Sequence, residues 1–294
     1  MEKQVIEDYI NAGRIASEVV KFAKNFIRPN MFLIEIAEKI EGKIQELGGS
    51  IAFPVNLSLN EVAAHYTPGL SDRTRAGGIL KVDLGVDING YIADCAFSLD
   101  LSEKSEFEDI IKTNEKALES ALLVIKSNVK IGEIGSAIQN FVGSKFSIVK
   151  NLSGHSLEKD SIHSGITIPN YSNDNMNKLK NVAIAIEPFL TFGDGYVYES
   201  SKSEIFMLQD DKPLRDKDSR ALLKFIKENY KTKPFCKRWL ERANLSKINF
   251  SLAQLCHQGI LHNFPVLIEK SKKPVSQFEH TVLILEEKAI ITTR

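Results

Sequence analysis

The sequence predicts an α+β fold, because blocks of helical periodicity alternate with strand-like blocks along the chain. Apolar residues recur at helical spacing from Val5 to Val20, and a second helical segment runs from about 33 to 47, where two glycines end it. Between Ile79 and Leu99 the pattern changes to that of strands. The chain has 294 residues, 43% of them hydrophobic, and can bury a large core as one big domain or one domain with an insert.

A β-hairpin is the strongest local signal, because Asp87-Ile88-Asn89-Gly90 separates two strand-like runs. Asp83 precedes this turn and Asp94 follows it. If the loop is Ile88-Asn89, the two aspartates stand directly opposite each other; if it is Asn89-Gly90, they are diagonal neighbours. Both registers put the two carboxylates on one face, since side chains alternate with period two. Like charges in such positions are destabilising, so we expect a cation between them.

The second half of the chain repeats the order of helices followed by strands. Helical patterns over about 104–127 and 133–146 precede further strand-like runs, which indicates two similarly built halves, although no residue-level repeat links them. A stretch of charged helical periodicity then follows, and the strand pattern resumes only near Pro265. We expect a main domain of residues 1–208 and 263–294 and a helical insert at 209–262 with a largely solvated surface.

Composition argues against several classes of protein. Lys plus Arg number 38 and Asp plus Glu also number 38, so no net field attracts nucleic acid or anionic membranes. The N-terminus lacks the pattern of a secretion signal, and no run approaches the roughly 18 apolar residues of a membrane span. Cys95, Cys236 and Cys256 lack C-x-x-C spacing, which argues against disulfides or a thiolate zinc site and favours a reducing cytoplasm. We interpret Cys95 as a small buried hydrophobe.

Four carboxylates and one imidazole occur in or beside apolar, strand-like runs, where an unpaired charge would be costly to bury. They are Asp83, Asp94, His155, Glu187 and Glu279. This is the kind of ligand set that a pair of divalent metal ions needs, and without cysteine it suits Mn, Fe, Co or Zn. Two adjacent ions can generate a hydroxide nucleophile and stabilise a tetrahedral oxyanion, which is the chemistry of amide hydrolysis.

The sequence context of these ligands resembles the metal-binding signature of the methionine aminopeptidases and their relatives with the pita-bread fold. The segments Asn151–Ser156, Ala185–Phe189 and Ser276–Thr281 carry the last three ligands. Phe53-Pro54, Ser58–Pro68 and Ile162–Gly165 look like the type II branch, in which a helical insert separates the last two ligands, and the chain resembles its compact archaeal form. The resemblance implies two pseudo-symmetric halves around a curved antiparallel sheet, with residues 1–208 and 263–294 as the catalytic domain.

The resemblance also implies roles for the individual residues. Asp94 and Glu279 would bridge both metal ions, Asp83 would complete one, and His155 with Glu187 would complete the other. Glu187 is the family's usual proton acceptor.

Two further histidines lie in family motifs. By resemblance, His163 would bind the substrate amide, and His65 would lie beside the scissile bond as a substrate-binding and catalytic residue. The alternative interpretation of both histidines is a structural role in a polar loop. His257, His262 and His280 are assigned no function, since the first two fall in or near the insert and strand alternation turns the third away from the face of Glu279.

An apolar pocket should select the first side chain of the substrate. Phe53, Ile162 and Leu267 match the family's pocket positions, although each could equally be an ordinary core residue. Phe264 occupies a position where the family commonly carries Tyr, which puts the hydroxyl hydrogen bond expected there in doubt.

The implied function is removal of the N-terminal methionine from peptides and nascent proteins with a small second residue, by a hydroxide bridging two divalent ions. We expect a cytoplasmic monomer with transient ribosome association and with neither membrane nor specific nucleic acid as a partner.

One alternative is an X-Pro dipeptidase or proline aminopeptidase of the same fold, although such relatives usually carry an extra N-terminal domain. The other is a non-enzymatic ribosome- or RNA-associated protein. Its basic face would come from Lys224, Lys227, Lys231, Lys233, Lys237, Arg238 and Arg242.

Overall fold

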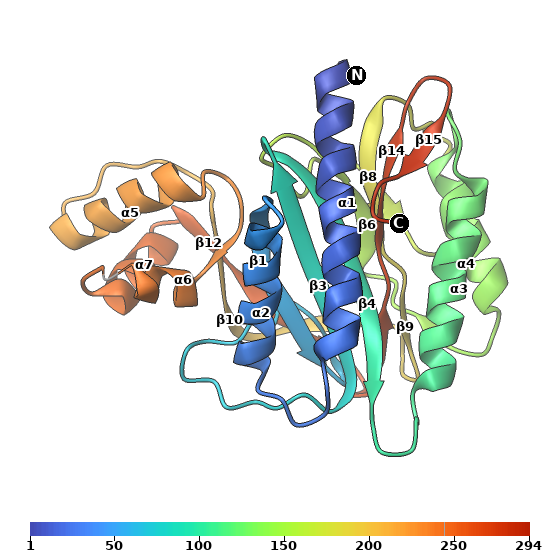
Figure 1. Ribbon diagram of the computed structural model, residues 1–294, viewed down its shortest axis with the longest axis horizontal. Coiled ribbons are helices and arrows are strands. Elements are labelled where there is room, and N and C mark those ends of the chain that lie inside the picture. Colours follow the sequence, from blue (N-terminus) through green and yellow to red (C-terminus); the bar gives the residue numbers. More distant parts are fainter. Residues whose placement is uncertain (244) are drawn as a thin grey trace.

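The first half of the chain is a three-stranded antiparallel sheet covered by two long helices. The computed structural model describes residues 1–243 and 245–294. Both N-terminal helices are present as expected, and they pack their apolar faces against the sheet, whose strand order is β1-β3-β4 (Figure 1). The elements are α1 (Lys3–Phe26), α2 (Leu33–Glu46), β1 (Ser50–Leu59), β3 (Gly78–Ile88) and β4 (Tyr91–Leu101).

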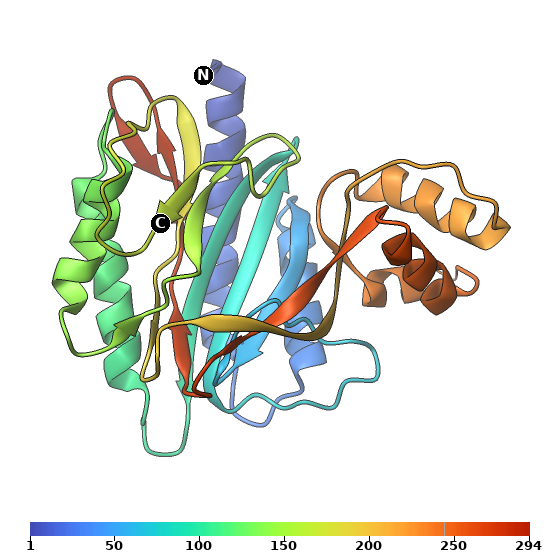
Figure 2. The same ribbon diagram turned by 180° about the vertical axis from the view of Figure 1, so that it is seen from behind.

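The second half repeats this plan with two helices and a five-stranded antiparallel sheet. The helices α3 (Glu108–Val124) and α4 (Ile131–Val142) cover the end of the molecule opposite the insert (Figures 1 and 2). The sheet has the order β15-β14-β8-β6-β7. Its strands are β6 (Ser153–Leu157), β7 (Thr167–Pro169), β8 (Val182–Ile186), β14 (His280–Ile284) and β15 (Ala289–Ile291). The predicted order of helices, strands, helices and strands is therefore confirmed.

The two halves are joined through strand backbone. Ala96 of β4 and Glu279, just before β14, exchange two backbone hydrogen bonds: the Glu279 N–H donates to the Ala96 carbonyl at 2.9 Å, and the Ala96 N–H donates to the Glu279 carbonyl at 3.4 Å. A small sheet, β13-β9-β5, lies nearby and consists of β13 (Val275–Gln277), β9 (Phe189–Thr191) and β5 (Ser147–Ile148). One apolar core runs through both halves. The junction between the halves is therefore fixed, and Ala96 is held beside Glu279.

A separate group of helices projects from one end of the molecule (Figure 1). It contains α5 (Lys217–Asn229), α6 (Lys237–Arg242) and α7 (Ile248–His257), which bury their own apolar cluster. A fourth sheet connects it to the main body in the order β11-β10-β12-β2. Its strands are β2 (Val62–Ala64), β10 (Val197–Leu208), β11 (Phe235–Cys236) and β12 (Leu261–Glu269). The division of the chain at 209 and 262 stays a prediction.

The return to strand structure comes earlier than the sequence pattern indicated. β12 begins at Leu261 and not near Pro265. Its first residues pair with the end of β10, with Leu261 opposite Leu208 and Asn263 opposite Phe206. This long-range pairing makes the segment a strand even though its residues do not alternate between apolar and polar.

The basic residues that the RNA-binding alternative assigned to a face of the insert are engaged in ion pairs. Each of the seven that the RNA-binding alternative invoked pairs with a carboxylate. Three of these partners, Glu38, Glu41 and Asp87, belong to the first half of the chain, and Asp160 belongs to the second. Most of these cations therefore attach the insert to the main body, which weakens the alternative of an RNA-binding surface on it.

Arg238 makes the most deeply buried of these attachments, with only 1% of its surface exposed. Its guanidinium donates to both oxygens of the Glu41 carboxylate at 2.7 and 2.8 Å and to the Pro68 carbonyl at 3.0 Å. The Trp239 indole also donates to Glu41, at 3.0 Å. A buried ion pair is stable when its remaining donors and acceptors are satisfied, so this network fixes α6 against α2.

None of the helices in the described part of the chain combines the length and the apolar character that a membrane span requires.

Candidate metal centre and active site

The hairpin of β3 and β4 places the first two candidate ligands. Ile88 pairs with Tyr91, so the loop is Asn89-Gly90, and both loop residues have positive φ values of 55° and 91°. Asp83 pairs with Ala96, and Asp94 pairs with Gly85. The two aspartates are therefore diagonal neighbours on one face, which is the second of the two registers that the sequence left open.

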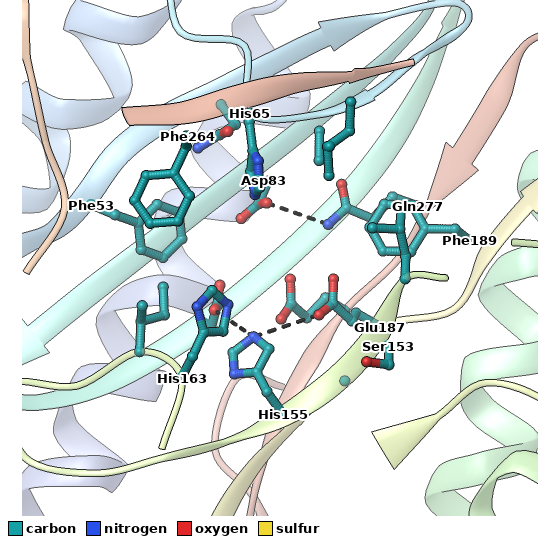
Figure 3. Close-up of a pocket in the computed structure, with 18 of the residues that line it drawn as sticks. Phe53, His65, Asp83, Ser153, His155, His163, Glu187, Phe189, Phe264 and Gln277 are labelled. Atoms are coloured by element: carbon teal, nitrogen blue, oxygen red, sulfur yellow. Dashed lines mark hydrogen bonds and ion pairs between the residues drawn. The ribbon is translucent and has the colours of Figure 1, made fainter. Parts of the chain in front are cut away.

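The other candidate ligands reach the same point from the second half of the chain (Figure 3). Asp94, His155 and Glu279 each offer a ligand atom, and these atoms all lie within 4.8 Å of one another. The His155 Nε2 atom lies 3.7 Å from Asp94 Oδ2 and 3.5 Å from Glu187 Oε1. His155 comes from β6, Glu187 follows β8 and Glu279 precedes β14. All five predicted residues thus line one cavity.

The polar atoms of this cluster fit a group of bound cations. Asp83 Oδ1, Asp94 Oδ1, Glu279 Oε1 and His155 Nδ1 are buried and have no hydrogen-bond partner among the residues that the structure describes. Burial raises the pKa of Asp83 to about 7, and it raises the pKa values of Asp94, Glu187 and Glu279 as well, with mutual repulsion adding to the effect. Buried, crowded and unpartnered carboxylates are the arrangement that divalent ions neutralise.

The His155 ring is neutral and available as a ligand. Burial, with a smaller contribution from the neighbouring His163, lowers its pKa to about 3. Its short distances to Asp94 and Glu187 are therefore not those of a charged ion pair. They are instead consistent with several ligand atoms directed at a shared centre.

His65 is held by its backbone and by one hydrogen bond. Its φ of 64° lies in the left-handed region, which is uncommon for a residue with a side chain. The ring Nδ1 lies 3.1 Å from the carbonyl of Pro265, which can only accept, so Nδ1 carries the proton. Burial lowers the pKa of His65 to about 4, and the ring is neutral. Its Nε2 atom is consequently left with a free lone pair.

His163 stands opposite His65 across the cavity (Figure 3). Its ring meets the His155 ring edge-on, with the centroids 4.4 Å apart. Burial lowers the pKa of His163 too. The two histidines therefore border the space beside the carboxylate cluster as uncharged groups, and both can exchange hydrogen bonds with a neutral amide.

The cavity has a volume of about 410 Å³ and an apolar side. Phe53, Ile162 and Leu267 all line it, as does Phe264, whose ring centroid lies 5.3 Å from that of His65. Phe53 packs over Gly85, where a Cβ would come within 2.2 Å of the phenylalanine ring. The lack of a side chain at Gly85 thus allows Phe53 to reach the cavity.

The structure also brings in residues that the sequence did not single out. Gln277 donates from Nε2 to Asp83 Oδ2 at 3.3 Å. Strand alternation could have predicted that Gln277 shares a face with Glu279, because the two are two residues apart. The Thr281 hydroxyl accepts from the Asp94 N–H and donates to its carbonyl, each at 2.8 Å. Ile205 and Pro234 line the cavity from either side of α5, and no local pattern marks them.

His262, near the insert, lies in β12, which begins one residue earlier at Leu261. Its ring packs edge-on against that of Phe264, with the centroids 4.7 Å apart. His262 therefore stands next to a cavity residue, although it does not itself line the cavity.

Comparison with known proteins places this chain among the metallopeptidases. The model of metallopeptidase family M24 matches residues 7–286. A methionine aminopeptidase from Pyrococcus horikoshii is 42% identical over 294 residues, which cover 98% of this chain and 99% of that protein. The chain therefore belongs to metallopeptidase family M24, and it is an enzyme of the methionine aminopeptidase group, as the resemblance of its motifs implied.

Solved structures show the same fold at low sequence identity. A thermophilic Arx1 has a TM-score of 0.84 at 16% identity and covers 99% of this chain and 91% of its own. The methionine aminopeptidase from Rickettsia prowazekii has a TM-score of 0.72 at 18% identity, with 100% of this chain and 98% of that chain covered. The expected pita-bread fold is confirmed.

The raised carboxylate pKa values predict that the ion-free protein loses stability as the pH rises. A group whose pKa is higher in the folded state stabilises the fold below its unfolded pKa, and this contribution is lost as the pH rises through the folded value. We expect the melting temperature in chelator to fall between pH 5.5 and 8.5. Added Mn²⁺ should raise it more at pH 8.5 than at pH 5.5. Scanning fluorimetry would measure both.

The matched control for this measurement is Glu279→Gln, which removes one ionisable group and should flatten the pH dependence. A melting temperature in chelator that stays constant or rises over this pH range would contradict the assignment of raised pKa values to the cluster.

Proposed function

We propose that this protein removes the N-terminal methionine from peptides and nascent proteins whose second residue is small, and that its centre holds two divalent ions. Asp83, Asp94, His155, Glu187 and Glu279 would hold these ions, with Asp94 and Glu279 shared between them. Ions bound there supply Lewis-acid activation of water and of the scissile carbonyl. The convergence of all five side chains on one cavity, in a chain 42% identical to a methionine aminopeptidase, is the observation that carries the proposal.

Glu187 is the best placed base for the attacking water. Its Oε1 atom lies 3.5 Å from His155 Nε2, inside the cluster and facing the cavity. Burial and the neighbouring carboxylates raise its pKa in the ion-free protein. We infer that it accepts a proton from water during attack and returns it to the leaving amine.

His65 and His163 would orient the scissile amide. Since the Pro265 carbonyl fixes the proton of His65 on Nδ1, its Nε2 accepts a hydrogen bond or a proton from a substrate N–H. His163 lies beside His155 on the other side of the cavity and would donate to the substrate carbonyl. Neutral rings suit both roles, because neither imposes a charge on the amide.

The apolar side of the cavity would receive the methionine side chain. Phe53, Ile162 and Leu267 offer it no hydrogen-bonding group, so a charged or strongly polar first residue would lose its hydration without replacement. Phe264 closes the same region without a hydroxyl. The selection made here would therefore depend on shape and apolarity.

The protein would act in the cytoplasm, where new polypeptides carry their initiating methionine. Its three cysteines are free, which suits a reducing compartment. We expect a monomer that meets nascent chains near the ribosome.

Substrate choice separates this proposal from its rivals. The protein is stripped of metal, and Mn²⁺, Co²⁺, Fe²⁺ and Zn²⁺ are restored one at a time. Released amino acids are then measured with Met-Ala-Ser, Ala-Pro and Ala-Pro-Gly. We expect methionine release that depends on the ion and little cleavage of the two proline peptides. Faster cleavage of a proline peptide would favour the X-Pro enzyme, and no cleavage together with RNA binding at low salt would favour the binding protein.

The role of His65 has a test of its own. Asparagine tolerates the left-handed backbone of this position, so His65→Asn should fold normally. It removes the imidazole from the scissile bond, and kcat/KM for Met-Ala-Ser should fall by about 100-fold or more, as is typical of a lost proton-transfer group. Metal content, measured by emission spectrometry, should not change.

His262→Asn is the matched control, because His262 lies beside Phe264 but outside the cavity lining. This variant should retain activity within about threefold. An activity of His65→Asn close to that of the native enzyme would remove His65 from the mechanism.

A further inference from the structure

Strand β10 has an edge that is left open between Val197 and Ile205. Along its other edge it pairs with β12 from Val197 to Leu208. On the open side, β11 pairs only with Ile205 and Phe206. Within residues 1–243 and 245–294, no further strand pairs with β10. An uncovered edge presents backbone N–H and C=O groups that another extended chain can bind.

The two ends of this open edge lie beside the active-site cavity. At one end, the Asn151 side-chain amide donates to the Val197 carbonyl at 2.7 Å and accepts from the Val197 N–H at 2.9 Å. Asn151 lines the cavity at this end, and Ile205 and Pro234 line it at the other. The open edge of β10 therefore runs between two points of the cavity lining, and Figure 2 shows the strand crossing in front of the sheet that contains β3 and β4.

Strand alternation identifies the free backbone groups. The N–H and C=O of Val197 point away from β12, because they bind Asn151. Glu199 is two residues further on and precedes the register shift at Lys202, so its own N–H and C=O point to the same edge. Glu199, Ser200 and Ser201 are exposed, and the two serines are small. Little therefore obstructs an approaching chain.

We propose that the open edge of β10 at Glu199 binds the backbone of the substrate residues that follow the scissile bond, as an added strand. This subsite rests on the proposed function, since only a peptide held by its first residue in the cavity passes this edge. Strand addition uses backbone hydrogen bonds and is largely independent of side chains. That suits an enzyme whose substrates share only their first residues.

The test compares a short with a longer substrate, Met-Ala-Ser-amide with Met-Ala-Ser-Thr-Val-amide. We expect kcat/KM to rise about fivefold or more with length, mainly through KM, as two added backbone hydrogen bonds allow. Methylating single backbone amides of residues three to five should abolish this gain at one position and leave its neighbour nearly unaffected, because alternate amides point away from the edge. This part uses the native enzyme.

Two variants of Glu199 separate backbone from side chain. Glu199→Pro removes the N–H that faces outward, at an edge position where proline is tolerated, and should reduce the ratio of pentapeptide to tripeptide kcat/KM to about one. Glu199→Ala keeps the N–H and should keep the ratio within about twofold of the native value.

The outcomes distinguish the subsite from the function. Equal kcat/KM for both lengths, or loss of the gain at every methylated position alike, would overturn the subsite while leaving methionine removal intact. A length gain kept by a folded Glu199→Pro would also overturn it. If Glu199→Pro does not fold, the methylated peptides decide the matter. If no peptide loses its methionine, the proposed function fails first, and the subsite fails with it.

Discussion

The burial of mutually repelling carboxylates is the constraint on which the rest of this structure depends. Asp83, Asp94, Glu187 and Glu279 meet in one cavity, and each has a raised pKa there. Such a cluster persists only if strong backbone geometry holds it in place. The paired backbone of Ala96 and Glu279 provides this, because it attaches the strand of one ligand to that of another. The repulsion also gives the centre its affinity for cations.

The insert contributes to the site without supplying a ligand. Its helices bury their own core, and the Arg238–Glu41 pair fixes them to α2. Pro234 within the insert and Ile205 shortly before it border the cavity. A change in how the insert sits would therefore alter the entrance of the cavity while leaving the carboxylate cluster untouched. Arg238 and Arg242 of α6 serve this attachment, since they pair with Glu41 and Glu38 of the main body.

The sequence predicted the parts of the site that local rules determine. Period-two alternation and the Asn89-Gly90 turn put Asp83 and Asp94 on one face, and the family motifs located His65 and His163. Other features arise only from long-range contacts. The proton on His65 Nδ1 depends on the carbonyl of Pro265, and β12 begins at Leu261 because β10 lies beside it. The open edge of β10 is likewise invisible in the sequence, because it depends on which strands are absent beside it.

We propose that two cations share one cluster of side chains from both halves of the chain. Anomalous diffraction from crystals grown with Mn²⁺ tests it directly, because the ions appear as separate peaks. We expect two neighbouring peaks, both in contact with Asp94 and Glu279, with Asp83 on one and His155 and Glu187 on the other. Peaks located away from these five residues, or a cavity free of metal at saturating Mn²⁺, would contradict it.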